Sequence, residues 1–85
     1  MSELITFPTI FPVKVMGANQ DDFESLVVQI VHKHASISTD EVVTTRLSRN
    51  GRFLSVTVHI HAESQDQLDA IYRELSAHER ILMML

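Results

Sequence analysis

The sequence predicts a single α+β domain in which one four-stranded antiparallel sheet carries two helices on one face. Three observations support this prediction: an Asn-Gly turn between two alternating runs, two segments with apolar residues at helical spacing, and short apolar runs near both ends. The alternating runs cover residues 43–47 and 54–58 and flank Asn50-Gly51. Asn-Gly favours the two-residue type I′ turn, whose central residues need positive φ, so this segment is predicted to be a β-hairpin.

Counting outward from the turn fixes the register of the hairpin. Leu47 faces Leu54 on one side of the sheet, and Arg46 faces Ser55 on the other. The remaining pairs are Arg49 with Arg52, Thr45 with Val56, Thr44 with Thr57, Val43 with Val58 and Val42 with His59. One face is apolar and the other polar, which is typical of a sheet covered on one side only.

The residues before the hairpin predict an extended arm, a strand and a helix. Residues 1–10 are apolar but interrupted by Pro8, so they are expected to lie along the domain as an arm. A strand follows at about Phe11 to Met16, with alternating faces, and Gly17 ends it. Asn19 is then expected to cap a helix. The apolar stripe of this helix comprises Phe23, Leu26, Val27, Ile30, Val31 and His34.

After the hairpin, Ser64 and Gln67 have the spacing of a capping box, which predicts a second helix that ends near His78. Its apolar stripe comprises Leu68, Ile71, Tyr72 and Leu75. The run 81–85 then predicts a last strand. Strand, helix, strand, strand, helix, strand is the ferredoxin-like βαββαβ plait, with the first and third strands in the centre. An independent helical hairpin is the alternative, but both helical stripes need the face of the strand hairpin for burial.

Composition limits the possible functions. Eighty-five residues make one small domain, which buries about 60% of the surface that its unfolded chain exposes. The net charge of −4 disfavours nucleic acid and anionic membranes as partners. The chain has no cysteine, no run that approaches the roughly 18 apolar residues of a membrane span, and no pattern of a signal peptide. We therefore expect a cytoplasmic protein that does not contact the membrane.

Several segments together resemble the YbeD-like family of small bacterial proteins. They are Phe7-Pro8-Thr9-Ile10-Phe11, Lys14-Val15-Met16-Gly17, Ser55-Val56-Thr57-Val58, the helix from Leu68 to Leu75 with Tyr72, and the final Leu-Met-Met-Leu. The resemblance covers nearly the whole chain and implies a ferredoxin-like fold similar to ACT-type regulatory domains, here over residues 11–85. Family members are often labelled as regulators connected with lipoate metabolism, a label that these residues do not account for chemically. Residues 18–22 lack the Pro-Gly that usually begins the first ACT helix, which argues against amino-acid binding.

Basic residues give the first set of candidate ligand-binding positions. Lys14 lies on a predicted central strand close to Gly17, where its amine could meet an anion. Arg46, Arg49 and Arg52 place three of the seven basic residues on one hairpin, and an anion such as a phosphate or a carboxylate could hold the facing pair together. The alternative for Lys14 is that its side chain extends across apolar neighbours or pairs with a carboxylate. The alternative for the arginines is a solvated turn that discourages aggregation at the sheet edge.

His59 and His61 are the candidate metal ligands. They lie two apart on a strand, so both rings project from the same face, and Asp40 would face His61 in the hairpin register. The pattern offers no further ligand, and polar residues on an open sheet face are the competing interpretation. We therefore expect no metal and no cofactor, and no nucleophile or acid–base pair stands out that would indicate an enzyme.

The terminal run is expected to be an edge strand that is apolar on both faces, with Leu82 and Met84 on one face and Ile81 on the other. Such an edge must be covered, either by the arm or by a second subunit. We therefore predict a homodimer with the terminal strand or the open sheet face at the contact, to which Phe7, Ile81, Leu82 and Met84 contribute. The favoured function is a non-enzymatic regulatory or adaptor protein that self-associates and binds a protein partner or a small ligand. The alternative is a small metal- or anion-binding protein.

Overall fold

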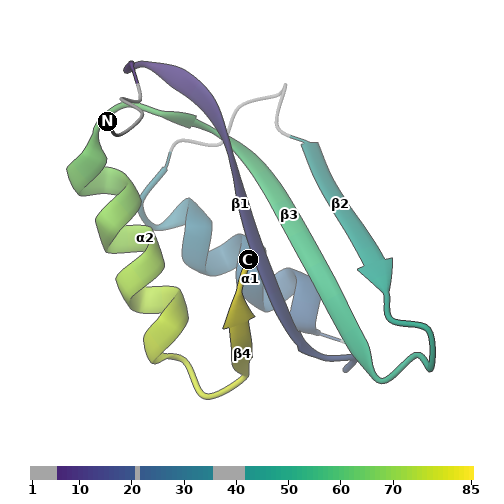
Figure 1. Ribbon diagram of the computed structural model, residues 1–85. Helices are drawn as coiled ribbons and strands as arrows, with labels where there is room; N and C mark the ends of the chain where they lie inside the picture. The colour runs from purple at the N-terminus through teal and green to yellow at the C-terminus, as the bar shows by residue number, and fades with distance from the viewer. Residues whose placement is uncertain (1–5, 21, 36–41) are drawn as a thin grey trace, which may run out of the picture.

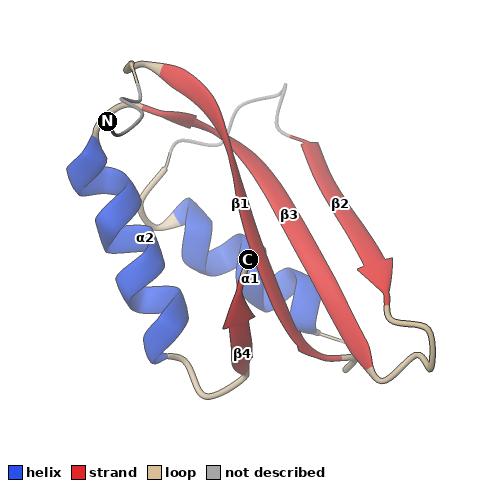
Figure 2. Cartoon of the chain, in the orientation of Figure 1, coloured by secondary structure: helices blue, strands red, loops and turns tan. Residues whose placement is uncertain are grey.

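The computed structural model describes residues 6–20, 22–35 and 42–85. Its elements follow the order β1 (Thr9–Ala18), α1 (Phe23–His32), β2 (Val42–Leu47), β3 (Phe53–Ala62), α2 (Gln65–Ala77) and β4 (Ile81–Met84). The strands form one antiparallel sheet in the order β2-β3-β1-β4, and both helices lie on the same face of it (Figures 1 and 2). The ferredoxin-like plait is therefore confirmed, with β1 and β3 at the centre.

The core lies between the sheet and the helices, because alternate residues of the central strands point that way. Val13 and Val15 of β1 are fully buried, whereas Lys14 between them is exposed. The same alternation along β3 buries Val56, Val58, Ile60 and Ala62. The helices contribute Phe23, Val27, Ile30, Val31, Leu68, Ile71 and Leu75. One face of the sheet is thus dry and the other is open.

The register of the β2–β3 hairpin is confirmed at all six pairs from Val42↔His59 to Leu47↔Leu54, but the turn type is not. A type I′ turn needs positive φ at both central residues, and only Gly51 has it, with φ 74°. Gly51 N–H donates to the Ser48 carbonyl at 2.9 Å, which closes a turn over residues 48–51 within the segment 48–52 that joins the strands. The segment between the paired residues Leu47 and Leu54 is still centred on Asn50-Gly51, and this common centre is why the register was right although the turn type was wrong.

The start of α1 differs from the sequence prediction. β1 extends through Gly17 to Ala18 instead of ending at Gly17, and Asn19 therefore lies beside the hairpin loop. The Asn19 backbone N–H donates to the Arg52 carbonyl at 2.8 Å, and its side-chain amide donates to the Gly51 carbonyl at 3.0 Å. The N-cap position of α1 is Asp22, whose side chain makes no capping hydrogen bond. In α2 the predicted cap is confirmed, since the Gln67 N–H donates to Ser64 Oγ at 3.1 Å.

The strand β4 does not alternate as its sequence predicted. Met84 pairs with Val15 and Met83 with Met16, but a register shift then brings Ile81 opposite Gly17. This irregularity turns both Ile81 and Met84 towards the core. Leu82 and Met83 consequently remain 57% and 50% exposed. The expectation that Leu82 and Met84 share a face is therefore wrong.

Ion pairs join the helices to each other and to the segment before β4. Glu74 of α2 accepts from Lys33 Nζ at 2.6 Å and contacts His34 Nε2 at 2.7 Å, so it ties α2 to the end of α1. Hydrogen bonds from Lys33 and then His34 lower the pKa of Glu74. Arg80 donates to Asp22 Oδ1 at 2.7 Å and lies 5.8 Å from the centre of the buried Phe23 ring. None of the helices in these described ranges is long and apolar enough to cross a membrane.

Candidate binding groove on the open sheet face

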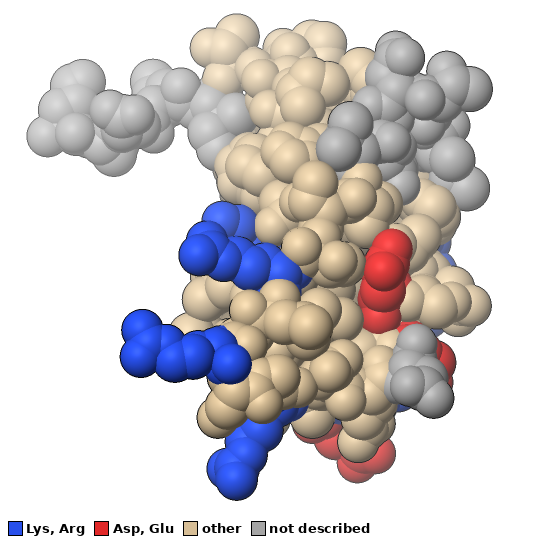
Figure 3. All heavy atoms as spheres, turned by 90° about the vertical axis from the view of Figure 1, so that its right-hand side faces the viewer, with Lys and Arg blue, Asp and Glu red and all other residues tan. Residues whose placement is uncertain are grey.

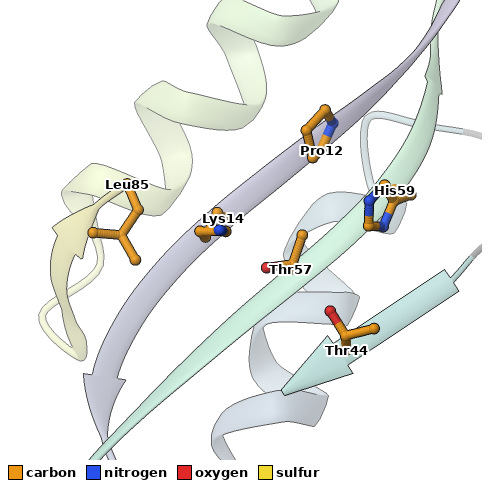
Figure 4. Close-up of a pocket in the computed structure, with 6 residues that line it drawn as sticks. All are labelled: Pro12, Lys14, Thr44, Thr57, His59 and Leu85. Carbon is orange, nitrogen blue, oxygen red and sulfur yellow. The ribbon is translucent and has the colours of Figure 1, made fainter. Parts of the chain in front are cut away.

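The open face carries rows of side chains that cross three strands. Lys14 of β1 lies opposite Thr57 of β3, and Thr57 lies opposite Thr44 of β2. Figure 4 shows these three residues in a line across the sheet. Two residues further along the strands, Ser55 of β3 lies between Met16 of β1 and Arg46 of β2. Because side chains alternate along a strand, all members of both rows belong to the open face.

These rows line a groove on the surface of the sheet. One part has a volume of about 510 Å³ and runs from Leu85 at the end of β4 across β1 and β3 to β2. The adjoining part has a volume of about 400 Å³ and shares Lys14, Thr44, Thr57 and Leu85 with the first. We call the two together the basic groove. Its lining residues are Pro12, Lys14, Thr44, Thr45, Arg46, Ser55, Thr57, His59 and Leu85.

The basic groove combines two cations with hydroxyl groups. Lys14 and Arg46 supply the charge, and Thr44, Ser55 and Thr57 supply hydroxyls that can donate hydrogen bonds. None of these lining residues is acidic. In the described part of the chain, the ion pairs involve Lys33, His34 and Arg80 rather than the two groove cations. The groove can therefore accept an anionic group.

Charge is distributed unevenly over the molecule although its net value is negative. In Figure 3, which views the molecule from the side of β2, most of the visible Lys and Arg atoms project to one side and the Asp and Glu atoms lie towards the other. The basic side is the one on which the open face lies. The acidic residues of the two helices, such as Glu24 and Asp69, belong to the other layer.

The candidate ligand residues thus separate into three groups. Lys14 and Arg46 come together in the basic groove, whereas Arg49 and Arg52 lie in the hairpin loop beyond the last ladder pair. Gly17 is buried on the opposite, helix-facing side of β1. A Cβ at position 17 would lie only 2.5 Å from the Arg80 carbonyl oxygen, so this glycine permits a close approach of two backbone segments.

The two candidate metal ligands both belong to the open face of β3. His59 is partly buried and lines the groove, and His61 is exposed two residues further along. Asp40, their expected partner, lies outside the described residues. Within the described ranges, no cluster of three or more His, Cys, Asp or Glu residues could hold a metal ion.

The candidate dimer residues occupy two kinds of position. Phe7, Ile81 and Met84 are partly buried and pack against the core of their own domain, whereas Leu82 is exposed. Met83 and Leu85 are each 50% exposed, and with Leu82 they form an apolar patch at the β4 end of the open face. We call these three residues the β4 patch.

Sequence reasoning missed the hydroxyl residues of the groove. The hairpin register predicts that Thr44 faces Thr57. This pair becomes part of a candidate anion site only because the β1–β3 pairing places Lys14 opposite Thr57. That pairing joins residues 43 positions apart. The alternation of Lys14 with Val13 and Val15 was the one available signal, because it put the lysine on the open face.

Fold and groove together define a small ferredoxin-like protein with one uncovered, partly basic sheet face. The chain belongs to the family described as "Protein of unknown function (DUF493)", which matches residues 2–85. It is 43% identical over 84 residues to a UPF0250 protein of Neisseria gonorrhoeae, covering 99% of this chain and 92% of the relative. It is 42% identical over 82 residues to a UPF0250 protein of Nitrosomonas europaea, covering 96% and 94%. These matches confirm the resemblance noted in the sequence; no solved structure matches the chain.

Proposed function

We propose that this protein is a non-enzymatic regulatory or adaptor module that acts in the cytoplasm as a homodimer and receives a partner on its open sheet face. The observation that carries the proposal is the open face itself, across which the basic groove runs from β2 to Leu85, where it meets the β4 patch. Cations and hydroxyls on an open surface hold a ligand in place. A surface of this kind supports binding better than a chemical reaction, which needs a reactive group paired with an acid or base.

Self-association is proposed to occur along β4. This strand pairs with β1 on one side and is the last strand of the sheet, so its other side is an edge. An edge with exposed apolar neighbours is a template for pairing with another chain. Stacking of two open faces is less favourable, because the Lys14 and Arg46 charges of both copies would approach each other. An edge-to-edge contact through β4 avoids this repulsion and covers the β4 patch.

Light scattering at tens of micromolar tests the dimer. Wild type is expected at twice the mass of the chain, and Met83→Lys is expected to be a folded monomer, because it places a charge in the β4 patch without entering the core. Arg49→Met is the matched control, since it changes a charge in the exposed hairpin loop, away from β4. A monomeric wild type would refute the dimer, and a dimeric Met83→Lys would remove the contact from β4.

Binding of a divalent metal is the alternative function, and His59 and His61 are the residues that favour it. Their placement on one face supports two ligands, and two ligands alone do not complete a tetrahedral zinc site. Calorimetry with zinc on wild type and on a His59→Ala, His61→Ala double variant distinguishes the two proposals. Stoichiometric binding that the double variant loses would favour the metal function over the adaptor function.

A further inference from the structure

We propose that the basic groove binds an extended, acidic segment of a partner protein, whose carboxylates are held by Lys14 and Arg46. This inference rests on the proposed adaptor role but not on self-association. It assigns the chemistry of the partner and the side chains that recognise it. The groove residues come from three strands, so a bound segment would cross β1, β3 and β2 as the row Lys14, Thr57, Thr44 does in Figure 4.

Charge complementarity gives the first argument. The two groove cations have no carboxylate partner among the ion pairs of the described ranges, and the groove has no acidic lining residue. Ser55 and Thr57 lie on β3, the strand between the two charges, and Thr44 lies two residues from Arg46 on β2. A carboxylate accepts hydrogen bonds only, so it suits a surface made of ammonium, guanidinium and hydroxyl donors.

The dimensions of the groove give the second argument. Neighbouring strands lie about 4.8 Å apart and alternate residues of a strand about 7 Å apart, so the backbone positions of Lys14 and Arg46, two strands and two residues apart, are separated by about 12 Å. In an extended peptide, residues i and i+2 project on the same side about 7 Å apart. The long side chains of Lys14 and Arg46 can cover the difference. Two acidic residues in alternate positions of one segment can therefore reach both cations.

The openness of the groove favours a polypeptide over a small metabolite. Sites for small molecules enclose about 70–90% of the ligand surface. Here Lys14, Thr44, Arg46 and Leu85 are all exposed, so the walls are low and a small ligand would stay largely in water. An elongated segment gains affinity from several contacts along its length and needs no enclosure.

Nucleic acid fits the groove less well than an acidic peptide. Sheet faces that bind single-stranded RNA stack bases on aromatic side chains of the central strands. The groove positions of β1 and β3 hold Pro12, Lys14, Ser55, Thr57 and His59, and Phe53, which is 37% exposed, lies at the far end of β3. The net charge of −4 also repels a long polyanion.

A synthetic seven-residue peptide that alternates serine and glutamate tests the proposal, with a glutamine-for-glutamate peptide as its uncharged control. Titration at 50 mM salt, followed by calorimetry and by backbone amide shifts, should show binding of the acidic peptide to residues of the groove. Lys14→Met and Arg46→Gln should each weaken binding about threefold, as expected for exposed charge pairs. Arg73→Gln removes one exposed positive charge from α2 and should leave affinity unchanged.

Four results would overturn the proposal. They are the absence of binding at millimolar peptide, equal binding of the glutamine peptide, equal weakening by Arg73→Gln, and tighter binding of free glutarate or of a thymidine oligonucleotide of the same charge. The last result would replace the peptide by a small dicarboxylate or by a nucleic acid. Light scattering on the same samples keeps the two proposals separate: a monomer that binds the peptide refutes only the dimer, and a dimer that does not bind it refutes only this inference.

Discussion

Replacing Gly17 by alanine should destabilise the protein although alanine is the more favourable residue in most strands. Gly17 lies in β1 and faces the helices, opposite Ile81 of β4. A Cβ added there would lie 2.5 Å from the tip of the Phe23 ring and 2.5 Å from the Arg80 carbonyl oxygen. Ordinary contacts of a Cβ begin at 3.4 Å, so both neighbours would have to move.

The expected loss of stability depends on how far the Phe23 ring and the Arg80 carbonyl can move away from the added Cβ. The Phe23 ring is fully buried and is covered by the Arg80 guanidinium, and the carbonyl belongs to the backbone just before β4. Overpacking a well-filled core costs about 1–3 kcal/mol, and two close contacts place this site in the upper part of that range. Alanine recovers about 0.5–1 kcal/mol of backbone entropy in a strand. The net loss should be about 2 kcal/mol, which lowers the Tm by about 10 °C in a domain of this size.

Urea denaturation followed by circular dichroism measures this change, and Gly51→Ala is the matched control. Nothing lies within 4 Å of a Cβ at Gly51, so that variant bears only the strain of φ +74°. Its cost should be about 1 kcal/mol and should not depend on Phe23. In a Phe23→Leu background, Gly17→Ala should cost less than in wild type, because one of its two clashes is relieved. A Gly17→Ala midpoint equal to that of wild type would disprove the close approach of β1 and Arg80.

Other substitutions test the turn, the helix contact and β4. Gly51→Val should cost about 1 kcal/mol or more by urea denaturation, since valine disfavours positive φ; an unchanged midpoint would contradict the loop conformation. The lowered pKa of Glu74 means that its stabilisation is present above the unfolded-state pKa and is lost as pH falls through the lower folded-state value. Glu74→Gln should therefore be less stable than wild type at neutral pH, and the difference should close in acid. Met84→Lys should lower stability by about 2 kcal/mol or more, because its side chain packs against the core, whereas Met83→Lys should leave the denaturation midpoint of the monomer unchanged.

The sequence predicted the plait because local signals agreed with one another. The hairpin register depends only on the centre of the turn, and it survived an incorrect turn type for that reason. The Ser64 cap also depends only on neighbouring residues. The cap of α1 failed because Asn19 is used elsewhere: it bonds to Gly51 and Arg52, more than 30 positions away in the chain. No local pattern distinguishes a capping asparagine from one that holds a distant loop.

The terminal strand shows a second limit of pattern reasoning. Alternation assumes a regular ladder, and five consecutive apolar residues give no polar residue that could reveal an irregularity. The register shift beside Gly17 is set by tertiary packing, since the chain must pass close to β1 there. As a result Ile81 and Met84, which regular alternation puts on opposite faces, both reach the core.

The groove is locally basic although the net charge of the protein is negative. The net charge of −4 argues against anionic partners for the molecule as a whole. At physiological salt, however, exposed charges interact over only about 8 Å, so an anion in the groove responds mainly to Lys14 and Arg46. The sheet separates these cations from the acidic outer surface of the helices, and the alternation of each strand decides which side a charge occupies. An acidic partner segment is therefore compatible with an acidic protein, provided that it approaches from the open face.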